Sequence, residues 1–301
     1  MSFKTITGRR NDLEGIEVNP VIGYIGDQIY PTLSVMEKTG SIYYKTLTAD
    51  DDVETGRVAG AAPSRTLLTD SVDTFSASEY IKRYGVVKAE VSQMGGIEQA
   101  DRLGGTASKR SVQRAIEAAQ IAKLFAGSAT DISAAIIAGI QTGADSVRRY
   151  AGTTAFVCSQ SVYRWIVAQT EITGKLAWTF GTNGVLAEDS LSMKTEMFKN
   201  FLQQIVAIDK VLIFDDDHEV AGKGDYAAIV KLPDPAEFSH KLDPVLGKTA
   251  LYLPDGLQQY EIESFYDEDE KVNNYDCTSW LDIKELNVDA KYLVDGLDTA
   301  S

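Results

Sequence analysis

The feature that most constrains the fold of this 301-residue chain is an amphipathic stretch, TASKRSVQRAIEAAQIAKLFAG, from Thr106 to Gly127. Its apolar positions at helical spacing are Val112, Ala115, Ile116, Ala119 and Ala122, and its other arc holds Lys109, Arg110, Gln113, Arg114, Glu117 and Lys123. Thr106 or Ser108 can cap the first turn, and Gly127 can follow the last turn in a left-handed conformation. We expect a helix of about 20 residues, a rod of ~30 Å. A rod of that length needs a flat layer to pack on.

The chain before this helix is extended and rich in turn residues. Residues 1–22 show no periodicity, which predicts an N-terminal arm, and the apolar residues between 21 and 35 are expected to anchor that arm on the core. A strand is predicted over 42–47, a tip rich in Asp, Gly, Ala and Pro over 50–64, and a second extended run over 72–92. Together, the two extended runs predict a long two-stranded finger.

The predicted finger carries four tyrosines, Tyr43, Tyr44, Tyr80 and Tyr84. An isolated two-stranded ribbon is marginally stable in water because no second layer covers its apolar face. Tyrosine combines a large contact area with a polar end and is favoured at protein contacts. We therefore expect the finger to lie on a neighbouring copy of the chain. The alternative is a small local core between its two strands.

The chain after the long helix alternates helices with short apolar strands, as layered α/β structures do. Its expected elements are a helix over 131–151, a strand over 153–158, a helix capped by Ser159 or Ser161, a helix over 191–202, strands over 205–214 and 226–232, and a hairpin of 258–266 with 275–288. Residues 171–189 predict a glycine-rich loop at an edge. Together with the extended first part, these elements predict an α+β fold.

Charge is distributed unevenly along the chain, whose formal net charge is −15. Residues 201–301 hold 22 acidic residues against 8 lysines and no arginine, whereas residues 1–200 hold 22 acidic and 21 basic residues. Affinity for nucleic acid comes from Lys and Arg side chains that neutralise phosphates. Because acidic residues outnumber basic ones in this chain, we do not expect it to condense on nucleic acid through one basic face. The division fits contacts in which an arginine-bearing part of one copy meets an acidic part of the next. A solvated acidic face is the alternative.

The composition excludes several other classes of protein. The hydrophobic content of 44% is ordinary for a globular core. The longest nearly apolar run, residues 134–140, is too short to span a bilayer, and residues 1–10 lack the apolar core of an export signal. Cys158 and Cys277 are predicted to be buried free thiols. We expect no membrane partner.

No motif in the chain predicts catalysis or a cofactor. Gly247, Lys248 and Thr249 match the end of a phosphate-binding loop, but the leading glycine is missing and Pro244 interrupts the loop. No GxSxG sequence is present. The two histidines, with the two cysteines, are too few for a structural zinc site. We expect a protein that is not an enzyme.

The sequence has two acidic clusters: Asp215, Asp216, Asp217 and Glu219, and Asp267, Glu268, Asp269 and Glu270. The first cluster offers oxygen ligands for a hard cation but lacks the spacing and the glycine of a calcium loop. We expect it to be a solvated turn. A weak ion site at an interface and a metal-dependent enzyme using residues 215–219 are the alternatives. The second cluster is expected to stand in water or to meet a neighbour's lysines and arginines, because adjacent carboxylates repel one another unless paired.

The segment IYPTLSVMEKTGSIYYKT, residues 29–46, resembles the N-terminal signature of the major capsid proteins of tailed bacteriophages. The residues that carry the resemblance are Ile29, Tyr30, Pro31, Val35, Thr39, Gly40, Ile42 and Tyr43. The order of parts along nearly the whole chain is similar to that family as well: an arm, an extended loop, a spine helix, an α/β domain and a β-rich return with a long hairpin.

The resemblance implies the α+β capsid fold of that family, with its parts at defined places in this chain. They are an N-terminal arm (1–36), an extended two-stranded loop (37–92), the spine-helix region of a peripheral domain (93–130), an axial domain (131–232), and a β-rich return with the C-terminal hairpin of the peripheral domain (233–301). The resemblance further implies that the chain self-assembles as hexamers and pentamers of an icosahedral shell that encloses double-stranded DNA. The shell would be assembled in the host cytoplasm and would be part of the virion. An encapsulin-like nanocompartment shell is the alternative.

The resemblance also implies partners. These are further copies of the chain, a separate scaffolding protein, a portal protein and decoration proteins, with no large N-terminal cleavage expected. Contacts between copies are expected at Tyr43, Tyr44, Asp50, Asp51, Asp52, Arg57, Arg65, Tyr80, Tyr84, Asp215, Asp216, Asp217, Asp267, Glu268, Asp269 and Glu270. An isopeptide crosslink, found in some relatives, would have to join Lys45 to Asn273 or Asn274.

Overall fold

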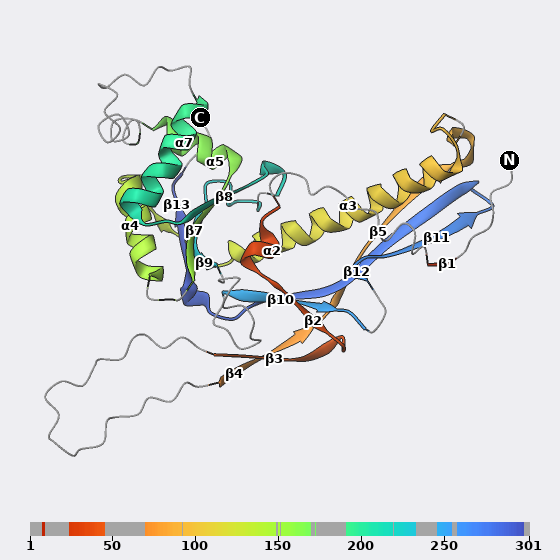
Figure 1. Ribbon diagram of the computed structural model, residues 1–301, viewed down its shortest axis with the longest axis horizontal. Coiled ribbons are helices and arrows are strands. Elements are labelled where there is room, and N and C mark those ends of the chain that lie inside the picture. The colour runs from red at the N-terminus through yellow and green to blue at the C-terminus, as the bar shows by residue number, and fades with distance from the viewer. Residues whose placement is uncertain are drawn as a thin grey trace, which may run out of the picture.

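The computed structural model describes residues 8–9, 24–45, 70–91, 93–148, 150, 152–169, 172, 191–218, 220–232, 246–254 and 258–297. These residues form an elongated molecule (Figure 1). The helix α3 (Ile97–Leu124) and the strand β12 (Val272–Glu285) run side by side along its length and pack on one another. A compact unit of helices and strands lies at one end, and a β-ribbon projects below the centre in the view of Figure 1.

Among the described residues, the strands form two sheets and a ribbon. The larger sheet contains, in spatial order, β1 (Gly8–Arg9), β11 (Glu261–Asp267), β12, β10 (Gly247–Tyr252) and β2 (Thr32–Val35), with β5 (Ser78–Val87) along the other side of β12. The second sheet contains β6 (Thr130–Asp131), β13 (Lys291–Asp295), β9 (Ala227–Leu232), β7 (Thr153–Ser159) and β8 (Lys210–Phe214). The ribbon is the antiparallel pair β3 (Thr39–Lys45) and β4 (Asp70–Ser76).

The remaining elements are helices and short turns. They are α2 (Gly26–Ile29), α4 (Ile136–Val147), α5 (Gln160–Ala168), α7 (Leu191–Phe201), the π-helical turn Leu202–Val206, and the 3-10 turns η1 (Lys88–Glu90), η3 (Asp216–His218) and η4 (Val288–Ala290). Ser159 caps α5 as predicted, because its hydroxyl accepts the N–H of Val162 at 3.2 Å. The strand-to-helix step from β7 to α5 is therefore confirmed.

The helix α3 is longer than the sequence predicted. It spans 28 residues and begins at Ile97, after Gly96, so neither Thr106 nor Ser108 caps it. The helix continues through Gly104 because the ring of Tyr275 on β12 packs there; a Cβ on Gly104 would lie 2.3 Å from that ring. Tertiary packing thus outweighs the low helix propensity of glycine. Gly127 has a φ of +120°, as predicted.

The buried stripe of α3 also differs from the simple periodic prediction. Val112 and Ile116 are buried as expected, but Ala115 is exposed, and Lys109 and Glu117 on the predicted polar arc are buried. The helix is covered on two sides, by the large sheet and by α2, so its buried arc is wider than that of a helix lying on one layer.

Three other predicted boundaries were wrong. The second extended run, 72–92, is two strands: β4 pairs with β3, and after Ala77 the chain enters the large sheet as β5, where Val86 is buried beneath α3. The strand expected over 205–214 begins only at Lys210, because the π-helical turn precedes it. The helix expected over 131–151 is α4 alone, since β6 and a turn occupy its first residues.

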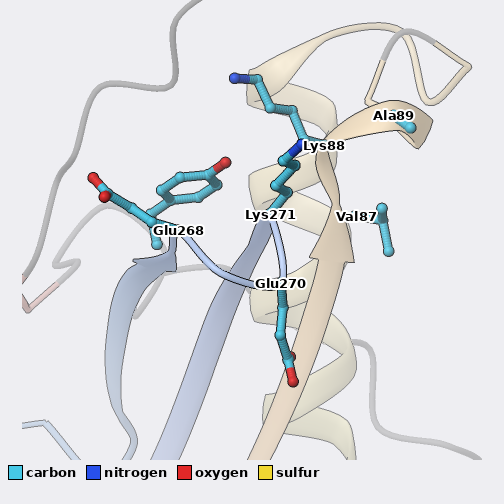
Figure 2. Close-up of a pocket in the computed structure, with 7 residues that line it drawn as sticks. Val87, Lys88, Ala89, Glu268, Glu270 and Lys271 are labelled. Carbon is cyan, nitrogen blue, oxygen red and sulfur yellow. The ribbon is translucent and has the colours of Figure 1, made fainter.

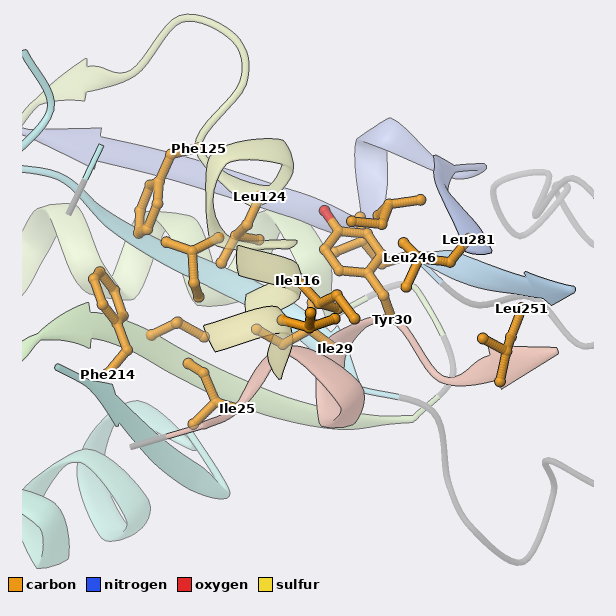
Figure 3. Packing of buried hydrophobic residues seen from close by; sticks show 14 of the residues in the cluster. Ile25, Ile29, Tyr30, Ile116, Leu124, Phe125, Phe214, Leu246, Leu251 and Leu281 are labelled. Atoms are coloured by element: carbon orange, nitrogen blue, oxygen red, sulfur yellow. The ribbon is translucent and has the colours of Figure 1, made fainter. Parts of the chain in front are cut away.

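The two larger of the three hydrophobic clusters among the described residues hold the body of the molecule together. One fills the space between α3, the large sheet and the near face of the second sheet, and Figure 3 shows Ile25, Ile29 and Tyr30 packed beside Ile116 and Leu124 of α3. The predicted anchoring of residues 21–35 on the core is confirmed at Ile29 and Tyr30, which are both 0% exposed. The other cluster lies between the second sheet and the helices α4, α5 and α7.

The two cysteines agree with the sequence analysis. Cys158 and Cys277 are free and buried, and burial raises the pKa of the Cys158 thiol far above its usual range. Of the described helices, none combines the length and the apolar character that crossing a bilayer requires.

Candidate functional site

The inner face of the β3–β4 ribbon is covered by its own chain. Ile42 and Phe75 are 2% and 6% exposed and pack with Ala250 of β10 and Leu286 after β12. Phe75 lies against Gly40 across the ribbon, where a Cβ would come within 2.8 Å of the ring. The prediction that the finger cannot cover its apolar side is wrong at this base. The cover comes from the body of the same chain, through Ala250 and Leu286, and the alternative of a core between the two strands alone does not describe it.

The outer face of the ribbon is uncovered. Tyr43 and Val72 are direct cross-strand partners and are 58% and 53% exposed. They stand on the face opposite Ile42, because successive side chains of a strand alternate between faces. Tyr44 lies on the inner face and is half-buried beside the Ile42 cluster. The ribbon therefore offers an aromatic and aliphatic pair to a partner on one face only.

The base of the ribbon is fixed to the large sheet by polar contacts. The ammonium group of Lys38 lies 3.2 Å from the ring centroid of Trp280 on β12. The backbone N–H of Ser76 donates to a carboxylate oxygen of Asp282 at 2.8 Å, and the N–H of Ala77 donates to the carbonyl of Lys38 at 2.7 Å. These contacts set the direction in which the ribbon leaves the body.

Tyr80 and Tyr84 are on β5 and are not part of the ribbon, which corrects their predicted place in the finger. Tyr80 packs against the main core, and the hydroxyl of Tyr84 hydrogen-bonds Ser111 of α3 at 3.3 Å. Their side of β5 therefore faces α3. The opposite side of β5 carries Ile81, which is 52% exposed.

An ion pair lies on this outer face of the large sheet. The guanidinium of Arg83 on β5 donates to both carboxylate oxygens of Asp276 on β12, at 2.7 and 2.6 Å, and stacks 4.6 Å from the ring of Phe265 on β11. Sequence reasoning missed this pair because its members are 193 residues apart. The sequence offered one signal, the alternation of polar and apolar residues in the two strands. That alternation indicates which face a side chain is on, but not which residue of another strand it pairs with.

The second acidic cluster lies in the turn at the far end of the β11–β12 hairpin. The carboxylate of Asp267 accepts the N–H groups of Asp269 and Glu270, at 3.0 and 3.2 Å, and thereby closes the turn. Beside it is a surface hollow of about 680 Å³, lined by Val87, Lys88, Ala89, Tyr266, Glu268, Glu270 and Lys271 (Figure 2). The hollow thus carries charges of both signs.

The first acidic cluster is tied to its own chain. Asp217 pairs with Arg114 of α3 at 2.5 Å, and Asp216 accepts the N–H of Ser161 at 2.8 Å. Asp215 accepts the N–H of Asp217 at 3.2 Å. No three His, Cys, Asp or Glu side chains of the described residues converge on a possible metal position. The metal-dependent alternative gains no support from this geometry.

Several of the predicted contact residues, and other residues considered from the sequence, lie outside the described residues. They are Asp50, Asp51, Asp52, Arg57 and Arg65, together with Glu219, His240 and most of the loop 171–189. Gly247, Lys248 and Thr249, considered as a phosphate-binding loop, belong to β10, and Lys248 is 1% exposed within the sheet. That segment is a buried strand.

A buried polar anchor between α3 and the N-terminal segment was not predicted. The carboxylate of Glu117 on α3 accepts the N–H of Ile25 at 2.6 Å and that of Gly26 at 3.0 Å. Burial raises the pKa of Glu117, and the two backbone hydrogen bonds oppose that shift. Just after the last residue of α3, the ammonium groups of Lys223 and Lys291 donate to the backbone carbonyls of Phe125 and Ala126, the latter at 2.8 Å.

Comparison with known proteins shows what this architecture is. No protein-family model and no curated protein matches the sequence. The chain is similar to the crystal structure of a phage-related protein from Bordetella bronchiseptica, with 15% identity, 98% of this chain and 99% of that chain covered, and a TM-score of 0.66. It is also similar to a subunit of the mature capsid of bacteriophage PhiM1, with 9% identity, 98% and 92% covered, and a TM-score of 0.54.

A third likeness is to the virus-like particle from Pyrococcus furiosus, with 8% identity, 88% of this chain and 90% of that chain covered, and a TM-score of 0.52. All three identities are low, so the likeness concerns the fold. The chain has the α+β fold of phage capsid subunits, as the sequence predicted. The match extends over nearly the full length of each chain, so the ribbon, α3 and the compact unit belong to one architecture.

Proposed function

We propose that this chain is a major capsid protein that assembles into the closed icosahedral shell of a tailed bacteriophage. The observation that carries the proposal is the correspondence of fold over 98% of this chain with a mature phage capsid subunit. A fold alone does not define a function. The uncovered surfaces of the subunit supply the second, physical support.

These surfaces are of the kind that assembly would cover. The ribbon projects from the body with Tyr43 and Val72 exposed, and the outer face of the large sheet exposes Ile81 beside Arg83. Each contact between copies can be weak, because a subunit held by several neighbours at once gains from effective concentration. Hexamers and pentamers are the rings that tile such a shell, and the outer face of the ribbon would lie on the adjacent subunit.

The remaining parts of the proposal follow from a shell function. The shell would enclose double-stranded DNA without sequence specificity, form in the host cytoplasm and remain in the virion. A separate scaffolding protein, a portal protein and decoration proteins are the proposed partners. The chain would have no catalytic role, and the second acidic cluster, Asp267 to Glu270, would serve contacts between copies.

The second candidate function is a nanocompartment shell that holds protein cargo. It is favoured by the likeness to the virus-like particle from Pyrococcus furiosus. The two functions share a shell and differ in its contents. Nucleic acid and cargo protein in purified particles therefore distinguish them.

The test is expression of the full chain, alone and together with a candidate scaffolding protein. Negative-stain microscopy should show closed particles of uniform size in at least one of the two preparations. Particles that contain host or phage DNA support the capsid function. Particles that enclose a cargo protein besides the shell protein, and no nucleic acid, support the nanocompartment. A chain that remains monomeric in both preparations contradicts either shell function.

A further inference from the structure

Three segments that are far apart in the sequence meet at the end of β8. They are the corner of residues 215–218, the middle of α3, and Tyr24 at the start of the described segment 24–45. His218 is 5% exposed, and its ring meets that of Tyr24 edge to face, with centroids 5.5 Å apart. Arg114 of α3 pairs with Asp217 of the corner at 2.5 Å.

The junction joins the compact unit to α3 at a second place. The end of α3 is fixed to the second sheet by Lys223 and Lys291 and by the contact of Phe125 with Phe214. Arg114 lies eleven residues earlier, about 16 Å along the helix at its usual rise. The first place combines an apolar contact with hydrogen bonds from two lysines to backbone carbonyls, whereas the second is made of titratable side chains that face one another.

The junction is electrostatically balanced around a neutral imidazole. Arg114 faces His218 from α3, Tyr24 faces it from the N-terminal segment, and Asp215 and Asp217 face it from its own corner. Burial, followed by the charge of Arg114, lowers the pKa of His218, and the two aspartates oppose this shift. The hydroxyl oxygen of Tyr24 is buried without a hydrogen-bond partner among the described residues. The closed junction thus already contains one unsatisfied polar group. A new buried cation would cost much more, because burying an unpaired charge is far less favourable than burying an unpaired hydroxyl.

We propose that this corner is an acid-released clasp between α3, the N-terminal segment and the compact unit. A proton taken up from solvent by the imidazole of His218 creates a cation next to Arg114, and the two cations then compete for the carboxylate of Asp217. The charged ring leaves its buried place against Tyr24, and the Arg114 pair opens with it. The clasp is a property of the single subunit and does not depend on shell assembly.

The direction of the pH effect follows from linkage. Since the pKa of His218 is lower in the closed junction than in an exposed histidine, the clasp stabilises the closed state above pH ~6.5 and loses that contribution as the pH falls through the lowered value. If the closed junction excludes the proton completely, the ratio of open to closed junctions rises up to about 30-fold between pH 7.5 and 5.0. The aspartates reduce this factor.

The experiment is amide hydrogen exchange of the unassembled full chain at pH 7.5 and 5.0, corrected for the intrinsic effect of pH on exchange. The variants are His218→Gln and the control His240→Gln, which removes the other histidine of the chain. In the wild type and the control, peptides covering 24–30, 110–117 and 215–218 should lose protection several-fold to about 30-fold at pH 5.0. His218→Gln should not show this pH-dependent loss. An equal loss in His218→Gln, or no local loss in the wild type, overturns the proposal.

A second measurement keeps the proposal testable if His218→Gln does not fold. The wild-type chain has two histidines, so their ring signals can be followed by NMR as the pH is lowered. One signal, absent from a folded His218 variant or assigned by its contact with Tyr24, should titrate below the usual histidine range. A signal for His218 that titrates at or above that range overturns the clasp.

Discussion

Glu117 binds Gly26 through both oxygens of its carboxylate, each 3.0 Å from the backbone nitrogen of a residue 91 positions earlier in the chain. Gly26 is required there for space, because a Cβ would lie 2.0 Å from the side-chain oxygen of Gln120. Gln120 in turn donates to Asp27 at 3.0 Å and to Thr249 at 3.2 Å. One turn of α3 thus fixes the N-terminal segment and a strand of the large sheet together.

Replacing Glu117 by Ala should destabilise the folded chain by about 1–3 kcal/mol, the cost of leaving buried donors without an acceptor. The N–H groups of Ile25 and Gly26 lose their hydrogen-bond acceptor. Chemical denaturation of the unassembled chain measures the change. Gln99→Ala, at an exposed position of the same helix, is the control and should remain within about 0.5 kcal/mol of the wild type. Equal effects of the two substitutions would show that Glu117 does not hold the segment.

The contact of Gly104 with Tyr275 gives a second prediction. Alanine is favoured over glycine in a helix by about 1 kcal/mol, so Gly104→Ala would stabilise α3 if the helix stood alone. In the folded chain the new methyl group would collide with the ring of Tyr275, which is 0% exposed and unable to swing outward. We expect a net destabilisation of about 1–3 kcal/mol, from overpacking.

Thermal or denaturant unfolding of Gly104→Ala checks this expectation. Ala115→Gly is the matched control, because Ala115 is exposed on the same helix and should lose only the propensity difference of about 1 kcal/mol. If Gly104→Ala is more stable than the wild type, α3 and β12 do not approach as closely as the structure shows.

How much of this fold is predictable from sequence is well illustrated by α3. Helical spacing predicted its centre, because Val112 and Ile116 are one turn apart. The cap of α5 at Ser159 was predicted in the same way, from a serine that precedes an apolar helix. The part of α3 before Thr106 was not predictable, because it depends on Tyr275, which follows more than 150 residues later. A local sequence pattern predicts the part of an element that its own residues stabilise, and it does not predict the part that depends on contacts with distant residues.

The candidate site shows the same division. The exposure of Tyr43 could be expected from the number of aromatic residues in a predicted ribbon. The burial of Ile42 could not, since it requires Ala250 and Leu286 from the last part of the chain. Glu117 was placed on the polar arc, because a buried carboxylate with backbone partners has the same spacing as an exposed one. Partner choice across long sequence separations is the information that a single sequence lacks.

The two faces of the ribbon should respond differently to substitution. Tyr43→Lys places a charge on the uncovered face, so the subunit should keep its stability within about 0.5 kcal/mol, and shell assembly should fail or slow at least tenfold if that face is buried between copies. Phe75→Ala opens a cavity on the covered face and should destabilise the ribbon base by about 3 kcal/mol. Circular dichroism reports the fold, and light scattering with electron microscopy reports assembly.

The comparison between the two ribbon variants separates folding from assembly. Ser41→Lys adds the same charge on the outer face, next to Tyr43, and shows whether charge alone blocks assembly. Normal shells from Tyr43→Lys would contradict the role proposed for the outer face. They would leave the measured stability effect of Phe75→Ala as an independent test of the inner one.

The pair of Arg83 with Asp276 should be a stabilising ion pair even though its arginine is exposed. The side chains are 58% and 11% exposed, so solvent screens the guanidinium while the carboxylate depends on it. Arg83→Ala should destabilise the chain by about 1 kcal/mol, and a double-mutant cycle with Asp276→Ala should give a coupling energy of similar size. Raising the salt concentration from 0.05 to about 1 M should reduce that coupling, because the Debye length falls to about 3 Å. The exposed pair Arg148 with Asp145 is the control, with an expected coupling below about 0.5 kcal/mol. Equal coupling in the two pairs would mean that the bidentate geometry and the ring of Phe265 add nothing to the strength of the ion pair.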